Sequence, residues 1–128
     1  MIPVQKSGGC GCGCSTAPKL IFSCSGAADV GELADRTARK LSRNGNGKMF
    51  CLAGIGGRVS GIIKSTEAAA SILAIDGCAL DCTKKSLEEA GLKNFNHLRL
   101  TDLGFEKGNT DVDTDAIAQV ADKAKVYL

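Results

Sequence analysis

Four of the seven cysteines lie just after segments that the sequence predicts to be β-strands. The carboxyl ends of parallel strands meet at one edge of a sheet, so thiols placed in this way can converge in space although they are far apart in the chain. Convergent thiols bind soft metal ions or carry out redox chemistry. The four are Cys24 after residues 19–23, Cys51 after residues 48–50, and Cys78 and Cys82 after residues 71–77.

A zinc ion suits such a set of thiols, because Zn–S bonds of about 2.3 Å allow four sulfurs to surround one ion. Cys78 and Cys82 are four residues apart at the predicted start of a helix, so we expect them to share one helix face. Free N–H groups and the positive end of a helix dipole favour thiolates at such a place. Nearby glycines leave backbone N–H groups room to approach the sulfurs; they are Gly26, Gly54, Gly56 and Gly77.

Two other interpretations of the same cysteines stay open. An iron–sulfur cluster accepts the same four thiolates as Zn²⁺. Alternatively, each cysteine taken singly is a small buried apolar residue, which is a common use of this amino acid. The spacing does not match a zinc ribbon, which uses two close pairs.

The elements that must position these thiols alternate along the chain. Apolar runs predict strands over about 19–23, 48–52, 71–76 and 97–102, with helices between them and after the last. The first helix is expected to begin near Asp29 and to bury Val30, Leu33, Ala34, Thr37 and Leu41. The pattern predicts an α/β fold: a small three-layer, doubly wound parallel sheet of about four strands in the order 2-1-3-4, flavodoxin- or Rossmann-like.

Composition excludes several classes of protein. Aromatic residues make up 4% of the chain and the net charge is +2, so a nucleic-acid-binding surface is not expected. Apolar runs fall short of the roughly 20 residues that span a membrane, and the N-terminus does not resemble a signal peptide. An odd number of cysteines without an export signal predicts thiols or metal ligands in a reducing cytoplasm rather than disulfides.

The first 18 residues are expected to form a flexible tail, followed by a single metal-binding domain over 19–128. The tail contains three cysteines within five Gly-rich residues, namely Cys10, Cys12 and Cys14. They could exchange metal with the main site, bind a soft ion such as Cu(I), or contact a protein partner. A tail whose thiols have no specific role is an equal alternative.

Other polar residues have structural interpretations. Asp76 and Asp81 are expected to secure a turn and a helix start, and Asp113 or Thr114 to cap the last helix. His97 begins the fourth predicted strand, so we expect it at the sheet edge opposite the thiols. The segment 53–58 could hold an anion with help from Arg58, although a tight turn is the simpler interpretation.

The segment Asp76-Gly77-Cys78-Ala79-Leu80-Asp81-Cys82 resembles the motif of the DGC family, which is named for Asp-Gly-Cys. The resemblance extends to Cys24-Ser25-Gly26 and to Cys51-Leu52-Ala53-Gly54-Ile55-Gly56, and covers residue 19 to the C-terminus. It implies zinc binding through Cys24, Cys51, Cys78 and Cys82, and implies nothing about the tail cysteines.

We therefore predict a zinc-binding protein in which the metal is closed and structural, or is sensed, stored or delivered. The alternatives are a thiol-based redox or sulfur-handling enzyme, with Cys78 as nucleophile and Cys82 or Cys24 as resolving thiol, and an iron–sulfur carrier. The absence of Cys-x-x-Cys and of a basic residue close to Cys78 in the sequence weakens the redox alternative. Enzymatic activity, a substrate and the oligomeric state stay undetermined at this point.

Overall fold

The computed structural model describes residues 17–128. Strands and helices alternate along this part of the chain, as the apolar runs predict. The strands are β1 (Lys19–Ser23), β2 (Lys48–Met49), β3 (Ser71–Asp76) and β4 (Asn96–Arg99). The helices are α1 (Asp29–Arg43), α2 (Leu52–Gly56), α3 (Ser60–Glu67), α4 (Cys82–Glu89) and α5 (Thr114–Ala124), with 3-10 turns η1 (Leu100–Leu103) and η2 (Lys125–Tyr127).

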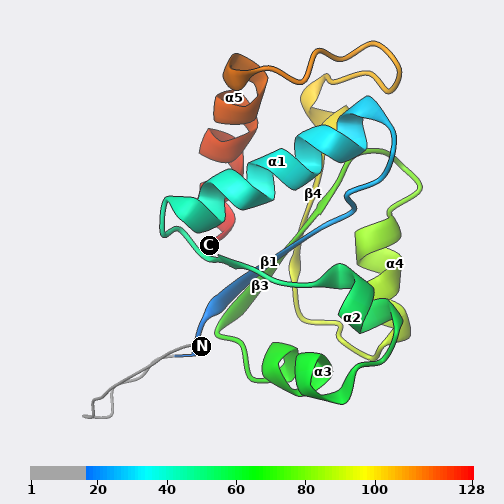
Figure 1. Cartoon of the computed structure of the whole chain (residues 1–128), viewed down its shortest axis with the longest axis vertical. Helices are drawn as coiled ribbons and strands as arrows, with labels where there is room; N and C mark the ends of the chain where they lie inside the picture. The colour runs from blue at the N-terminus through cyan, green and yellow to red at the C-terminus, as the bar shows by residue number, and fades with distance from the viewer. Residues whose placement is uncertain (1–16) are drawn as a thin grey trace.

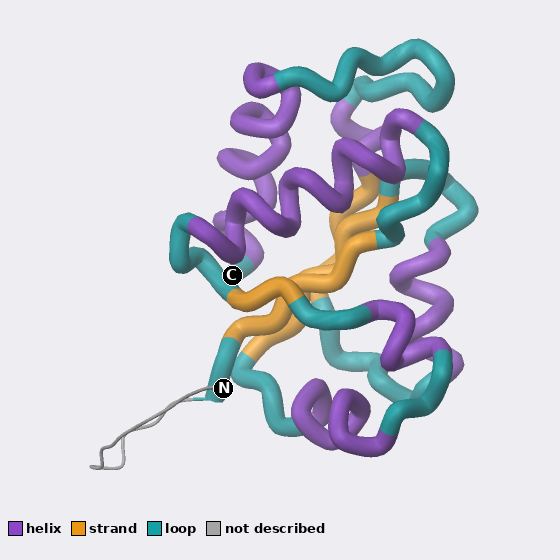
Figure 2. The backbone as a smooth tube through the Cα atoms, viewed as in Figure 1, coloured by secondary structure: helices purple, strands orange, loops and turns teal. Residues whose placement is uncertain are grey.

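The four strands form one parallel sheet in the order β2-β1-β3-β4, which confirms the predicted α/β fold and strand order. Helices α1 and α5 cover one face of the sheet, and α2, α3 and α4 lie on the other (Figure 1). Figure 2 shows the same arrangement, with the strands between two groups of helices. The direction of progression reverses between β1 and β3, and ligands of such folds bind beyond the carboxyl ends of the strands at that point.

Each face of the sheet has its own apolar core, because neighbouring residues of a strand point to opposite faces. In β1, Ile21 packs with α1 and α5, whereas Leu20 and Phe22 pack with residues of α2 and α4. The continuous apolar run of β3 divides in the same way, with Leu73 and Ile75 on the first face. Burial on both faces explains why these two strands lack the alternation of a half-exposed strand.

Helix α1 buries the apolar face that the sequence predicts; its residues Val30, Leu33, Ala34, Thr37 and Leu41 are all inaccessible to solvent or nearly so. The exposed face carries the ion pairs Glu32–Arg36 and Asp35–Arg39, at 2.9 and 2.8 Å. Asp29 is the first residue of α1, where the sequence predicts this helix to begin. Its carboxylate accepts one N–H from Val30, but it also binds the N–H groups of Gly108 and Thr110 at 2.9 Å each, which attaches the loop before α5 to the start of α1.

The second strand is shorter than predicted, and a helix follows it directly. β2 ends at Met49, and Leu52–Gly56 forms α2 where the sequence predicts a glycine-rich turn. The Cys51 sulfur accepts the N–H of Gly54 at 3.4 Å and so caps this helix. A side-chain acceptor at the N-cap offsets the low helix propensity of the glycines.

Close backbone packing explains the glycine in the Asp-Gly-Cys segment. A Cβ atom on Gly77 would lie 2.7 Å from the carbonyl carbon of Val30, in the first turn of α1. Gly31 has a similar constraint, since its Cβ would meet the Gly26 carbonyl oxygen at 2.7 Å. The first turn of α1 therefore approaches both the turn after β1 and the turn after β3 more closely than a side chain allows.

None of the helices formed by residues 17–128 combines the length and the apolar character needed to cross a bilayer.

Candidate functional site

The four predicted site cysteines all follow strands at the carboxyl edge of the sheet. Cys24 comes directly after β1 and continues the ladder, because its N–H donates to the Ile75 carbonyl at 3.1 Å. Cys51 lies two residues beyond β2, Cys78 two residues beyond β3, and Cys82 is the first residue of α4. All four are free thiols; Cys51 and Cys82 are exposed, and Cys24 and Cys78 are partly buried.

The sulfurs share this edge without forming a closed cluster. Within residues 17–128, one set of three potential ligands has its ligand atoms within 4.8 Å of one another, and it consists of Asp76, Asp81 and His97 rather than of cysteines. Cys24 and Cys51 come together as lining residues of one open hollow of about 480 Å³, with Ser23, Phe50 and Ser86 among its other walls.

The prediction that Cys78 and Cys82 share a helix face is wrong. Helix α4 begins at Cys82, so Cys78 lies in the turn before it. Two features fix that boundary: Asp81 has a left-handed backbone with φ of 54°, and the Asp76 carboxylate accepts the N–H groups of Thr83 and Lys84 at 2.7 and 3.1 Å. These two N–H groups belong to the first turn of the helix, where unpaired donors need an acceptor.

A basic residue lies close to Cys78 in the folded chain, although none is close to it in the sequence. The Lys107 ammonium is 3.7 Å from the Cys78 sulfur. Lys107 is 29 residues away in the chain and lies in the loop that Asp29 holds against α1. A cation at this distance stabilises negative charge on a sulfur, whether that charge serves a metal ion or a reaction.

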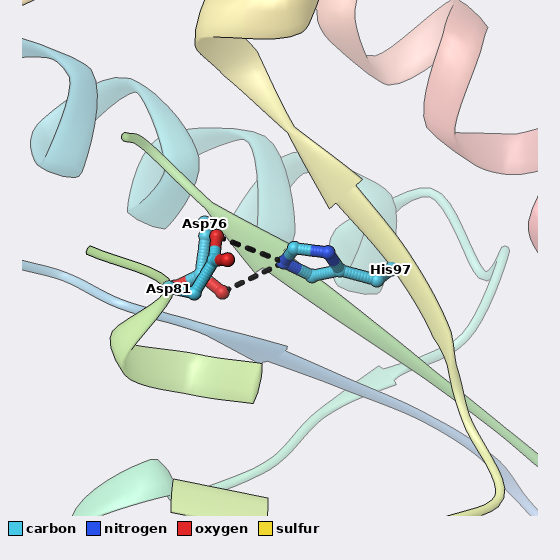
Figure 3. Close-up of side chains that lie close together, drawn as sticks. All are labelled: Asp76, Asp81 and His97. Carbon is cyan, nitrogen blue, oxygen red and sulfur yellow. Dashed lines mark hydrogen bonds and ion pairs between the residues drawn. The ribbon is translucent and has the colours of Figure 1, made fainter. Parts of the chain in front are cut away.

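Asp76 is a buried carboxylate that connects three elements. It is 1% exposed, and besides the two N–H groups of α4 it binds His97 Nε2 at 2.9 Å (Figure 3). The expectation that His97 lies at the opposite edge of the sheet is wrong. Strand β4 has four residues, and His97 pairs in register with Ala74, so its ring reaches the carboxyl end of β3.

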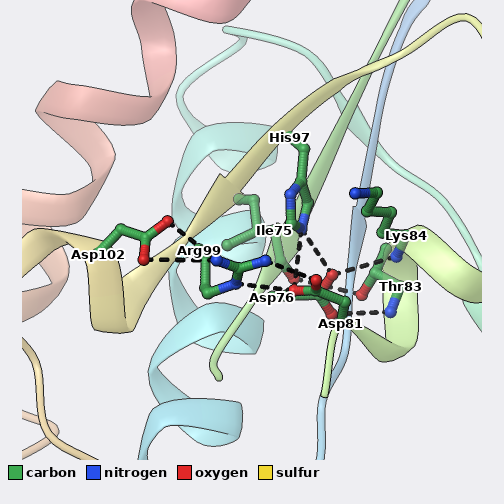
Figure 4. Close-up of polar contacts among 8 residues, drawn as sticks. All are labelled: Ile75, Asp76, Asp81, Thr83, Lys84, His97, Arg99 and Asp102. Carbon is green, nitrogen blue, oxygen red and sulfur yellow. Dashed lines mark hydrogen bonds and ion pairs between the residues drawn. The ribbon is translucent and has the colours of Figure 1, made fainter. Parts of the chain in front are cut away.

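Asp81 is held by Arg99 from β4. The guanidinium donates to both carboxylate oxygens, through Nε at 2.8 Å and through a terminal nitrogen at 2.5 Å, and it also contacts Asp102 (Figure 4). Hydrogen bonds from Arg99 hold the pKa of the Asp81 carboxyl below its usual value, and burial, which opposes this, is the smaller effect. Asp81 raises the pKa of Arg99 in return.

The two aspartates therefore fix the segment that carries Cys78 and Cys82. Asp76 holds the start of α4, and Asp81 ties the turn between the two cysteines to β4. Their oxygens are already occupied by N–H and guanidinium donors, which makes the Asp76–Asp81–His97 group a structural network. The sequence predicts structural roles for both aspartates but gives no sign of their partners His97 and Arg99.

The segment 53–58 does not form an anion cradle. The Arg58 side chain donates to the carbonyl oxygens of Ile55 and Glu89, at 2.9 and 3.1 Å. It thus satisfies carbonyl groups at the ends of α2 and α4, which are the groups that helices leave unpaired. Asp113 fulfils its predicted role, because its carboxylate accepts the N–H of Ala116 at 2.8 Å and caps α5.

Comparison with known proteins identifies the family of the chain. The family model described as the DGC domain matches residues 20–124. The chain belongs to the DGC domain family. This DGC domain is 35% identical over 109 residues to the "Anaerobic and virulence modulator AnvM" of Pseudomonas aeruginosa, an alignment that covers 85% of this chain and 81% of AnvM. No solved structure matches the chain.

The family match begins after the N-terminal cysteines. Cys10, Cys12 and Cys14 lie outside both the matched residues and the residues that the structure describes, so their predicted roles stay predictions.

Proposed function

We propose that this DGC domain binds one Zn²⁺ through Cys24, Cys51, Cys78 and Cys82, and that it senses, stores or delivers the metal. The observation that carries the proposal is the placement of four free thiols after three adjacent strands at one edge of the sheet. Parallel α/β sheets use this edge for ligands, and thiolates are the protein groups that zinc prefers in closed sites.

Four thiolates are a suitable set of ligands for zinc, but to bind one ion their sulfurs must lie closer together than they do in this structure. Four thiolates around Zn²⁺ have their sulfurs about 3.8 Å apart, given Zn–S bonds of about 2.3 Å. The turns after β2 and β3 must therefore bring their sulfurs inward. The Gly54 N–H already donates to the Cys51 sulfur, and Lys107 lies beside Cys78. Both groups would offset part of the net negative charge of a four-thiolate site.

The test is native mass spectrometry of the full chain purified without oxygen and without an affinity metal column. We expect one zinc per chain, with four protons displaced on binding. The variants Cys24→Ser, Cys51→Ser, Cys78→Ser and Cys82→Ser are each expected to lose the ion. The triple variant that changes Cys10, Cys12 and Cys14 to serine is the matched control and is expected to retain it.

Three results would contradict the proposal. A Cys78→Ser variant with full stoichiometry would show that the four thiols do not form one site. Loss of zinc in the control variant would place the ligands in the N-terminal segment. A mass that corresponds to an iron–sulfur cluster would keep the ligands and change the function to electron or cluster transfer.

The Lys107 contact favours a second candidate function, a thiol-based redox role centred on Cys78. The related protein is named an anaerobic modulator, and a response to oxygen through thiols is consistent with that name. In this case the metal-free protein should react at Cys78 with a neutral alkylating reagent faster than at Cys82, and Lys107→Met should abolish the difference. Equal reaction at both cysteines in the unaltered protein would exclude this role.

A further inference from the structure

A band of positive charge lies next to the exposed thiol of Cys51. The outer face of α1 carries Arg36, Arg39, Lys40 and Arg43, which line a hollow of about 540 Å³ between α1 and α5. Arg39 and Arg43 also line a second hollow, of about 430 Å³, that reaches Cys51. Arg39 and Cys51 both line the third hollow, which contains Cys24. The three hollows thus connect a cationic surface to the thiol edge.

Much of this charge is available to a ligand. Asp35 accepts from Arg39 through Nε at 2.8 Å, and the terminal nitrogens of Arg39 have no partner among residues 17–128. Within the same residues, no carboxylate lies within 4.0 Å of Lys40 or Arg43. Lys and Arg in the last turn of a helix also complement its dipole. That effect explains the position of Lys40 and Arg43 on α1, and it leaves their hydrogen-bond donors free to bind a ligand.

The geometry points to a binding site for carboxylate-bearing low-molecular-weight thiols and disulfides, with the carboxylates on Arg39 and Arg43 and the sulfur at Cys51. Arginine presents a planar fork that matches a carboxylate. The volume of each hollow is in the range of about 300–1,000 Å³ that small-molecule sites have. The inference rests on the thiol edge of the proposed function and adds the class of molecule that reaches it.

The reaction that this site supports is thiol–disulfide exchange. The Cys51 thiolate attacks one sulfur of the bound disulfide, a new S–S bond forms between Cys51 and that sulfur, and the other half leaves as a thiolate. The Cys51 sulfur is oxidised and the leaving sulfur is reduced to the same extent, so the bound disulfide is the only oxidant that the step needs. The product is a mixed disulfide on Cys51, and the exchange is reversed when the released thiol is in excess.

The test compares three disulfides of different charge on the full-length, reduced and metal-free protein. Oxidised glutathione is anionic, bis(2-hydroxyethyl) disulfide is neutral and cystamine is cationic. Peptide mapping by mass spectrometry gives the initial rate of adduct formation at Cys51 and at Cys82, which is also exposed. Dividing the rate at Cys51 by the rate at Cys82 removes the intrinsic reactivity of each reagent. The remaining difference between reagents reports the effect of the charges around each thiol.

We expect this ratio to be roughly tenfold higher for oxidised glutathione than for the neutral disulfide, at the lower end of the range for a cationic cleft. High salt should reduce the preference, because exposed charges are screened within a few ångströms at molar ionic strength. Arg43→Gln should lower it severalfold, and the double variant Arg39→Gln/Arg43→Gln should abolish it. The control Lys85→Gln/Lys123→Gln removes two exposed charges that line none of the three hollows and should leave it unchanged.

The inference is overturned if the anionic reagent shows no preference for Cys51, or if Arg43→Gln, which breaks no ion pair, leaves the preference intact. Because the measurement uses metal-free protein, its outcome is independent of zinc binding. Zinc binding without charge preference would leave the proposed function standing, and charge preference without zinc binding would favour a thiol-based role in which Cys51, rather than Cys78, is the reacting thiol.

Discussion

Gly77→Ala should destabilise the protein, because the added methyl group has no space. The new Cβ would lie 2.7 Å from the carbonyl carbon and oxygen of Val30 and 2.9 Å from the Gly31 nitrogen. These atoms belong to the backbone of α1, so they cannot move aside as a flexible side chain would. Restoring an ordinary contact of 3.4 Å requires α1 and the turn after β3 to separate by about 0.7 Å.

Overpacking of this kind costs about 1–3 kcal/mol. Replacing glycine also restricts the unfolded chain, which offsets about 0.4–1 kcal/mol of that cost. The net fall in the free energy of unfolding should therefore be about 1 kcal/mol and at most about 2.6 kcal/mol, which corresponds to a decrease in Tm of roughly 3–10 °C for a domain of this size. Thermal unfolding followed by circular dichroism, with urea unfolding at 25 °C, measures both quantities.

Gly61→Ala is the matched control, since it is the same substitution within helix α3 and its Cβ would meet nothing within 4 Å. Alanine is the better helix former by about 0.5–1 kcal/mol, so this variant should be more stable than the unaltered protein. The two substitutions should therefore have opposite signs. If Gly77→Ala has an unchanged or higher Tm, the close approach of α1 to the Asp-Gly-Cys turn is refuted.

Three further substitutions test the polar network and the core. His97→Ala should leave metal stoichiometry unchanged and lower stability by about 1 kcal/mol, because Asp76 loses a hydrogen bond; loss of the ion would make His97 a ligand. Asp81→Asn should flatten the pH dependence of stability in acid: the folded pKa of Asp81 lies below 3.8, so its contribution is present above that pH and is lost as the pH falls through the folded value. The free energy of unfolding can be measured by urea titration at several pH values between 6 and 3; an equal decrease with falling pH in both proteins would contradict this. Thr37→Val should raise stability by about 1 kcal/mol, since the buried Thr37 hydroxyl has no hydrogen-bond partner among residues 17–128; a decrease in urea midpoint would show that it has one.

The order of the strands could be predicted from the sequence because β1 and β3 are continuous apolar runs separated by helical patterns. Such runs predict buried parallel strands, and the crossover rules leave few topologies. The same reasoning places Cys24, Cys51 and Cys78 at one edge, since it requires only that strands end where their apolar runs end.

The contacts of the site depended on details that periodicity does not encode. Helix α2 is not predicted from the sequence because Gly54, Gly56 and Gly57 favour a turn, and because Cys51, whose sulfur caps the helix, is not a usual N-cap residue. The position of His97 cannot be predicted from the sequence, because β4 is short and its register with β3 cannot be inferred from its own four residues. Lys107 lies in a loop without periodicity, and its position depends on the distant carboxylate of Asp29.

The pairing of β1 with β3 also determines when during synthesis the thiol edge can exist. β1 is paired with β2 over two register positions, Leu20 with Lys48 and Ile21 with Met49, and with β3 over five. The core therefore cannot close until residue 76 has left the ribosome. At about 5–20 residues per second, roughly 3–11 s separate the synthesis of Cys24 from that of Cys78. During this interval Cys24 and Cys51 have no folded surroundings. Any ion or adduct that contacts these cysteines together with Cys78 or Cys82 must therefore be acquired after β3 has been translated.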